Sequence, residues 1–453
     1  MSEYENTYKE EEEEEEEESP KKKKSLLSMG GTPGYMLLAY PFIYLIFSRR
    51  RDTADAYATI DLSAMVFIIY SFICMLVGLV SISNSNKERD ENGEIIEKDD
   101  DNDEDDPKPS FSYLVLFKSP LKWFLAYTAL GLISCLWSVN LALTIYRAIE
   151  CFAMTIVMVA TLNELLKSKD VNIAIQWSLW FVFIYILVRI FSYLRWTHDI
   201  DIILQACQMI ATAFFFLALY HAKQWYIKLT ILIFSIFAGS TVAWIGIAAG
   251  FIGLAYGNAK KKSLLFTAIA IIVVAATMMG GKAFLKKTIF YDKEGVGAQY
   301  TSGRDKIYEY SFASAKKKPI LGYGFVSGET DLIKHQWHRT GVISTHDGFL
   351  SALLGEGIIG VIFLALFFIQ VFIASKNKHI PVKYKPALIG TAIFGFFESI
   401  GNPGIGTRVF GAWISVMFTY ILICSFYVYY TKDIDEDEDL DEIEDENDED
   451  EDD

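Results

Sequence analysis

The sequence is poor in the residues that build metal centres and disulfide frameworks. It has five cysteines and six histidines in 453 residues. All five cysteines fall inside apolar runs, and no two of them have the spacing of a zinc site. The Asp-x-Asp pattern occurs only within dense acidic runs, where composition alone generates it. We therefore expect no structural zinc, no disulfide scaffold, no metal-dependent active site and no cofactor.

The beginning of the chain lacks the basic region and the short apolar stretch of a removable signal peptide, so we expect none. Residues 1–28 instead carry nine consecutive glutamates, Glu10–Glu18, followed by Lys21–Lys24. Like charges at this density repel one another and cannot bury a core. We expect a disordered tail, the alternative being a helical polyanion that contacts a partner.

Apolar residues, in contrast, make up 52% of the chain. Most of the apolar segments approach the ~20 residues that a membrane-spanning helix needs. We predict an all-α polytopic membrane protein with about twelve transmembrane helices. The apolar segments are 30–48, 62–82, 119–138, 142–164, 173–194, 201–221, 225–239, 241–257, 263–281, 347–374, 386–401 and 409–430.

The net charge of −16 hides a strong separation of charge. Three segments, 1–18, 84–109 and 433–453, hold 40 of the 57 acidic residues. The rest of the chain is therefore basic. That suits a protein that handles anionic lipids or sugar phosphates, although a basic rim is also ordinary for a membrane protein.

Lysines in the short loops indicate how the protein is oriented in the membrane. They fall on one side of the membrane if the apolar segments alternate, and the positive-inside rule assigns that side to the cytoplasm. We expect a multi-pass protein of the inner (plasma) membrane with both termini cytoplasmic. Arg49–Arg51 disagree: either the first segment is not a simple span, or these arginines snorkel at the outer interface. The lysines are Lys118 and Lys122, Lys167 and Lys169, Lys223 and Lys228, Lys260–Lys262, and Lys376–Lys385.

These assignments divide the chain into seven parts. They are a disordered cytoplasmic tail (1–28), two transmembrane helices (29–83), an acidic cytoplasmic loop (84–110), transmembrane helices three to nine (111–281), a long extracytoplasmic loop (282–346), the last three transmembrane helices (347–432) and an acidic cytoplasmic tail (433–453).

The long outer loop and the helix after it carry a set of short motifs. In order these are Gly303-Arg304, Pro319–Gly324 (PILGYG), His346 with Leu350, and Gly355–Gly360 (GEGIIG). Upstream, Leu136–Asn140 (LWSVN) is followed by Thr144 and Arg147. Together they resemble the O-antigen ligase and Wzy-type polymerase superfamily, with the upstream motif most similar to exopolysaccharide polymerases of the ExoQ type. Two places differ from the family pattern: Asp347 stands where Asn is usual, and Gly239-Ser240-Thr241 where a Ser-Arg pair is common.

The resemblance implies an enzyme that transfers or polymerises a polyprenyl-pyrophosphate-linked glycan at the outer face of the membrane, with inversion at the anomeric carbon. Such a reaction needs a base, cations for the departing pyrophosphate and a groove for the lipid. His346 is the candidate catalytic base, because histidine titrates near neutral pH. The alternative is a histidine that caps the following helix or bonds to the loop. His335 and His338 flank it as lesser candidates.

Arginines are the candidate pyrophosphate-binding groups. Arg304 offers a bidentate fork, or is an ordinary surface residue of the loop. Arg147 lies inside an apolar segment, which marks a functional site by default, but Glu150 at i+3 offers a simple ion pair. Arg189 sits similarly near the outer end of its helix. Lys316, Lys317 and Lys318 suit an anionic glycan, or form a solvated charge run.

Four further charged residues lie near outer helix ends: Asp347, Glu356, Glu398 and Arg408. We expect them to orient the residues that contact the substrate without touching the substrate themselves. The expected partners are the lipid-linked glycan donor, a glycan or lipid-linked acceptor, and membrane lipids, with no nucleic acid. Polymerase is favoured over ligase. The alternatives to an enzyme are a solute transporter and a membrane scaffold. A solute transporter would place charge on broken helices near the bilayer midplane. A membrane scaffold would explain the acidic tails but not the loop.

Overall fold

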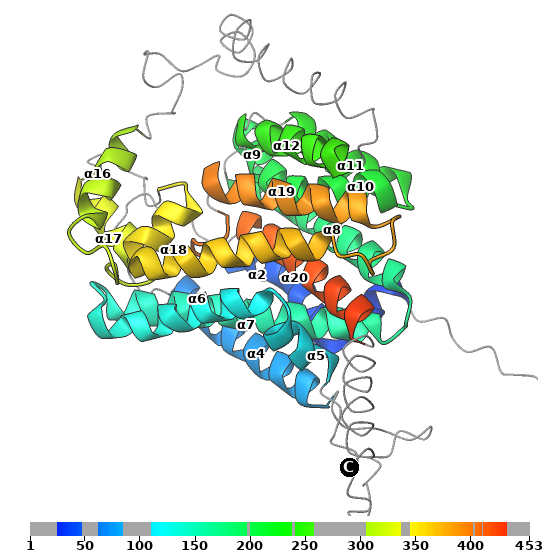
Figure 1. Ribbon diagram of the computed structural model, residues 1–453, viewed down its shortest axis with the longest axis horizontal. Coiled ribbons are helices and arrows are strands. Elements are labelled where there is room, and N and C mark those ends of the chain that lie inside the picture. The colour runs from blue at the N-terminus through cyan, green and yellow to red at the C-terminus, as the bar shows by residue number, and fades with distance from the viewer. Residues whose placement is uncertain are drawn as a thin grey trace, which may run out of the picture.

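A computed structural model describes residues 25–47, 62–84, 110–196, 200–237, 241–257, 305–336, 345–401, 404–409 and 411–432. In these ranges the regular elements are all helical and none is a strand (Figure 1). The predicted all-α class is therefore confirmed for this part of the chain. The three acidic segments and Arg49–Arg51 lie outside it, except for Asn84, the last residue of a helix.

Eleven of the apolar segments coincide with helices, while the segment 263–281 lies outside the described residues. The segment 201–221 holds two helices joined by a 3₁₀ turn, Thr212–Phe214. The helices are α2 (Gly31–Phe47), α4 (Leu62–Asn84), α6 (Leu121–Ile133), α7 (Leu141–Leu166), α8 (Val171–Trp196), α9 (Ile200–Ala211), α10 (Phe215–His221), α11 (Trp225–Phe237), α12 (Thr241–Gly257), α18 (Gly348–Ser375), α19 (Lys385–Gly401) and α20 (Gly411–Thr431).

Six helices in the described ranges are long and apolar enough to cross a membrane. A seventh span results if α5 (Phe111–Tyr113), the π turn after it and α6 are taken together across a bend of 71°. The shorter apolar helices α11 and α12 fall below the length of a span. The chain is thus a helical multi-pass membrane protein, and the count of about twelve spans stays a prediction.

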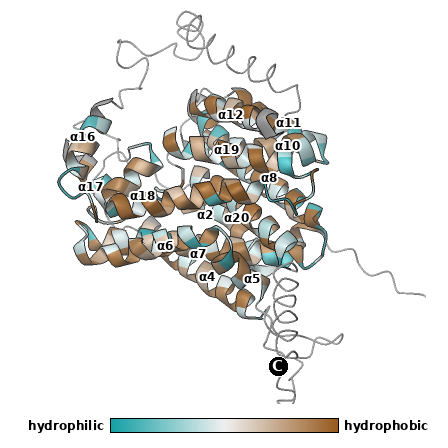
Figure 2. Ribbon diagram, viewed as in Figure 1, coloured by the Kyte–Doolittle hydropathy of each residue, from teal (hydrophilic) through white to brown (hydrophobic). Residues whose placement is uncertain are grey.

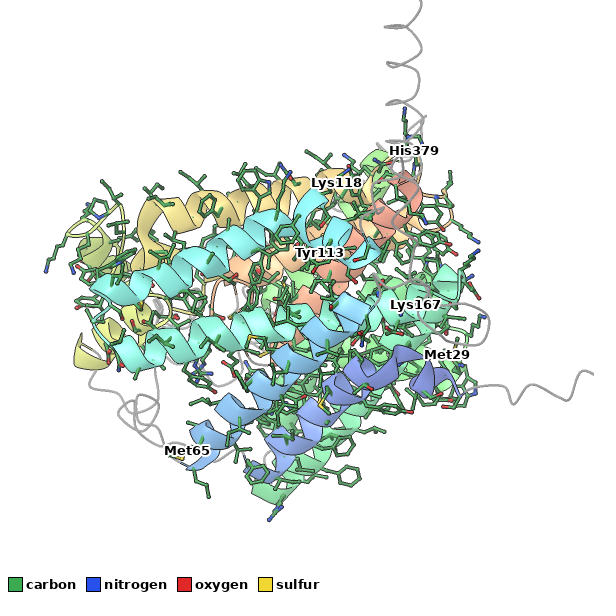
Figure 3. All side chains as sticks on the ribbon, turned by 90° about the horizontal axis from the view of Figure 1, so that it is seen from below. Met29, Met65, Tyr113, Lys118, Lys167 and His379 are labelled. Atoms are coloured by element: carbon green, nitrogen blue, oxygen red, sulfur yellow. The ribbon has the colours of Figure 1, made fainter. Side chains whose placement is uncertain are left out.

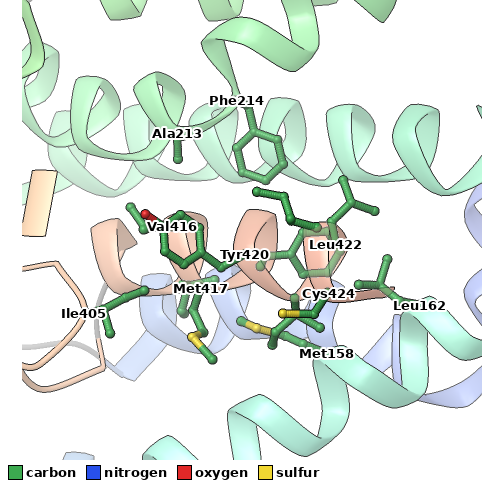
Figure 4. Packing of buried hydrophobic residues seen from close by; sticks show 14 of the residues in the cluster. Met158, Leu162, Ala213, Phe214, Ile405, Val416, Met417, Tyr420, Leu422 and Cys424 are labelled. Carbon is green, nitrogen blue, oxygen red and sulfur yellow. The ribbon is translucent and has the colours of Figure 1, made fainter. Parts of the chain in front are cut away.

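Helix α20 forms the axis of the bundle. In its apolar window 94% of the residues are buried, against 28% in the peripheral α4. It packs against α7, α8, α9, α18 and α19, and Figure 4 shows its Tyr420 and Cys424 beside Phe214 and the α7 residue Met158. A helix that is apolar all round fits this central place. Helix α4 turns a broad apolar face outward instead (Figure 2).

The two ends of the bundle differ. Lys167 and His379 lie at one end (Figure 3), whereas α16 (Asp305–Ala315) and α17 (Ser327–Gln336) lie at the other (Figure 1). This agrees with the predicted separation of the lysine-bearing loops from the long loop.

Candidate functional site

The motifs PILGYG and GEGIIG form the two halves of one joint. Helix α18 is broken at Gly357, whose φ of 67° lies in the left-handed region. The turn between α16 and α17 fills the break: Tyr323 N–H donates to the Leu354 carbonyl and Gly324 N–H to the Gly355 carbonyl, each at 2.8 Å. The broken helix thereby satisfies its freed backbone groups and holds the loop against the end of the bundle.

The motif LWSVN fastens the same turn from the opposite side. Trp137 Nε1 donates to the Leu321 carbonyl at 2.8 Å, and Val139 N–H donates to the Tyr323 carbonyl at 2.9 Å. The hydroxyl groups of Ser138, Thr144 and Ser327 lie within 2.7 to 2.8 Å of one another. These bonds tie α17 to the first turn of α7.

His346 is the residue before the N-cap of α18, and its backbone is in the left-handed region. Its φ is 56°, which a residue with a Cβ rarely adopts. The next residue, Asp347, is the helix cap and accepts a hydrogen bond from Leu350 N–H at 3.0 Å. The alternative that His346 caps α18 is therefore wrong.

A buried arginine on α8, Arg189, lies against a tyrosine of α2, Tyr44. Arg189 is only 5% exposed, and its guanidinium carbon lies 3.9 Å from the centre of the Tyr44 ring. The Tyr44 hydroxyl lies close to Arg189 and within electrostatic range of Arg408 and Arg147. Sequence reasoning picked out each arginine separately but missed Tyr44, because an aromatic residue in an apolar helix carries no distinctive signal.

Arg189 has unused hydrogen-bonding capacity. Its Nε and Nη1 atoms are buried and meet no hydrogen-bond acceptor among the described residues. Besides Tyr44, its guanidinium faces the rings of Tyr185 and Tyr193 at 5.8 and 5.5 Å. Buried donors are normally satisfied, so these two are available to an acceptor group that the described residues do not supply.

Arg147 is more nearly neutralised. Its Nη1 atom lies 2.6 Å from a carboxylate oxygen of Glu150, and its guanidinium stacks over the Tyr146 ring at 4.5 Å. The i+3 ion pair that was the alternative for this residue therefore exists. Arg147 adds less unbalanced positive charge to the cluster than Arg189 does.

The other predicted site residues are dispersed. Glu356 lies fully buried at the break in α18, and neither of its carboxylate oxygens has a hydrogen-bond partner in the described ranges. Glu398 is buried on α19. Lys316, Lys317 and Lys318 are exposed after α16, with Lys318 over the Tyr323 ring. Arg304, His338 and the side chain of His335 lie outside the described residues.

An apolar groove of about 710 Å³ runs between α18 and α19. Its walls include Phe349, Phe368, Phe372 and Phe396, and its one polar lining residue is Asp347, next to His346. A groove of this composition fits a hydrocarbon chain. Within the described residues, no group of three or more His, Cys, Asp or Glu side chains is arranged to hold a metal ion.

The comparison with known families agrees with the motifs. Residues 226–365 match the family model described as O-antigen ligase, a stretch of just under a third of the chain that runs from α11 into α18 and includes His346. The motif at Leu136–Asn140 lies outside the matched range. No curated protein matches the chain. The resemblance to the O-antigen ligase and Wzy-type superfamily is thereby confirmed.

Proposed function

We propose, with the O-antigen ligase match of residues 226–365 as the premise, that this multi-pass membrane protein is a glycan ligase or polymerase. The donor is a glycan on a polyprenyl pyrophosphate, and transfer takes place at the outer face of the plasma membrane. The observation that carries the proposal is the buried guanidinium of Arg189, which lies over the Tyr44 ring with two of its donor atoms unused within the described residues. Arg147 and Arg408 add positive charge within electrostatic range of Tyr44. Such a cluster suits the two phosphates of the donor.

In the proposed reaction, His346 removes the proton of an acceptor hydroxyl as its oxygen attacks the anomeric carbon. The bond from that carbon to the phosphate oxygen breaks, and the lipid pyrophosphate leaves with the bonding electrons. The arginines stabilise the charge that develops on it, so no step requires a metal ion. The segment 404–409 that carries Arg408 packs against Gly348, which brings the cation cluster and the start of α18 together.

A transporter is the second candidate, because α18 is a broken helix with a buried carboxylate, Glu356, at the break. However, the Pro319–Gly324 turn fills this break, and the backbone of Ile320 lies where a Gly357 side chain would be. Solute uptake into liposomes without glycan turnover would favour the transporter. The acidic tails of the scaffold hypothesis lie outside the described residues.

The orientation is testable with single cysteines. Ala313 on α16 is exposed, and Val382, in the loop at the opposite end, is 78% exposed. Both variants are made with Cys135, which is not fully buried, changed to serine. We expect Ala313→Cys to react with an impermeant thiol reagent in intact cells, and Val382→Cys to react only after permeabilisation. The reverse pattern would place the site on the wrong side for the proposed donor.

The groove provides a further prediction: it takes the isoprenoid chain of a lipid-linked substrate. Ile369 lines the groove and is 55% exposed, whereas Ile362, on the same helix and 49% exposed, does not line it. Ile369→Trp fills the groove, so it should raise the KM for the lipid-linked glycan about tenfold through lost apolar contact. Ile362→Trp is the matched control. Equal KM values for the two variants would remove the groove from substrate binding.

A further inference from the structure

We infer that Glu329, acting through Thr345, is a positioning residue for His346. This rests on the proposed function, in which His346 is the base. Glu329 lies on α17 and is only 2% exposed. A carboxylate is costly to bury unless its oxygens are hydrogen-bonded, so the bonds that it receives indicate what it does.

Both donors of Thr345 reach the same carboxylate oxygen, Glu329 Oε1. The Thr345 hydroxyl lies 2.9 Å from it, and the Thr345 backbone N–H also donates to it. The Asp347 carbonyl lies equally close to the Thr345 hydroxyl, at 2.9 Å. A bond to a carboxylate is stronger than one to a neutral oxygen, so the single hydroxyl proton points to Glu329. The hydroxyl oxygen then accepts from Ser351 Oγ at 3.1 Å and from Asp347 N–H at 3.3 Å.

These bonds fix the residues on both sides of His346. Thr345 is held by Glu329, and Asp347 is held by Thr345 and by its own bond to Leu350 N–H. His346 between them has a φ of 56°. A strained backbone persists only where its surroundings impose it, and the Glu329–Thr345 pair is a contact that helps to impose it here.

The same short helix reaches the cation cluster. Two residues before Glu329, Ser327 bonds to Ser138, which precedes α7, and to Thr144 in the first turn of α7. Arg147 follows one turn later on the same helix. Helix α17 thus acts as a strut between the element that carries Arg147 and the segment that carries His346. Loss of the contacts that α17 makes should misplace His346 relative to the donor phosphates, without removing His346 or Arg147.

The test compares isosteric threonine variants, with release of polyprenyl pyrophosphate from the lipid-linked glycan of the source cells as the assay. Thr345→Val removes the hydroxyl, so we expect kcat to fall by about tenfold to a hundredfold with KM for the donor unchanged. Thr345→Ser should retain most of the activity. The control is Thr161→Val, a buried threonine on α7 whose hydroxyl bonds within its own helix at 2.7 Å; it should match the wild type.

Glu329 should behave in the same way. Glu329→Gln keeps an amide oxygen that accepts from Thr345 and should rescue part of the activity that Glu329→Ala loses. In a His346→Ala background, Thr345→Val should cause no further loss, because a residue that acts through His346 has nothing left to position. Full additivity of the two losses, or a Thr345→Val enzyme as active as Thr161→Val, would overturn the inference. A wild type that releases no polyprenyl pyrophosphate would instead refute the proposed function.

Discussion

His346→Ala should lower the rate of glycan transfer by roughly 10² to 10⁴, while the donor binds as it does to the wild type. General-base catalysis acts on the chemical step alone, and the arginines around Tyr44 that bind the donor remain in place. The measurements are the turnover rate of purified protein in lipid and the affinity for the polyprenyl-pyrophosphate-linked glycan in the same preparation.

His221→Ala is the control for a histidine away from the site, since His221 ends α10 and its ring lies tilted against that of Tyr384. It should keep near wild-type turnover. Treatment with EDTA should leave the wild-type rate unchanged. An active His346→Ala enzyme, or a wild type that chelation inactivates, contradicts the mechanism even if the protein proves to be a glycosyltransferase.

The helices could be predicted because lipid imposes one solution on a long apolar segment: its backbone must satisfy its own hydrogen bonds. Helix α2 nevertheless continues through Pro41, because membrane helices tolerate a proline where neighbouring groups satisfy the carbonyl that it leaves free. What hydropathy could not reveal is the break in α18. The segment 347–374 reads as one uniform helix, and only the docked Pro319–Gly324 turn makes Gly357 the point where it opens.

The site was predictable residue by residue but not as an assembly. Arg147 and Arg189 stand out because charge is expensive inside an apolar helix. The contact of Arg189 with Tyr44, and the presence of Arg147 within electrostatic range of the same tyrosine, depend on how α2, α7 and α8 pack, and no local pattern encodes that. Glu329, in contrast, does not stand out in the sequence. It lies in a polar stretch, where a carboxylate that becomes buried looks the same as one on the surface. Arg304, the most prominent cation of the long loop in the sequence, lies outside the described residues.

Arg189 and Arg147 have different partners, so we expect their alanine variants to differ in how they affect donor binding. Arg189→Ala should weaken donor binding by about tenfold to a hundredfold, the value of one or two charge-assisted hydrogen bonds. Turnover should fall as well, because the same bonds persist as the pyrophosphate departs. Arg189→Lys should restore only part of the affinity, since lysine lacks the planar fork and stacks less well on Tyr44.

Arg147 should respond differently, because Glu150 already takes one of its donors at 2.6 Å. Arg147→Ala removes a cation but leaves the buried Glu150 carboxylate unpaired beside the donor site, so its loss combines reduced attraction with new repulsion. The double variant Arg147→Ala with Glu150→Gln removes the repulsion and should bind the donor better than Arg147→Ala alone. Glu150→Gln by itself should bind the donor at least as tightly as the wild type, since it frees the Arg147 guanidinium. If instead Glu150→Gln weakens donor binding as much as Arg189→Ala does, the Arg147–Glu150 pair is a structural support of α7, and Arg189 and Arg408 alone hold the pyrophosphate.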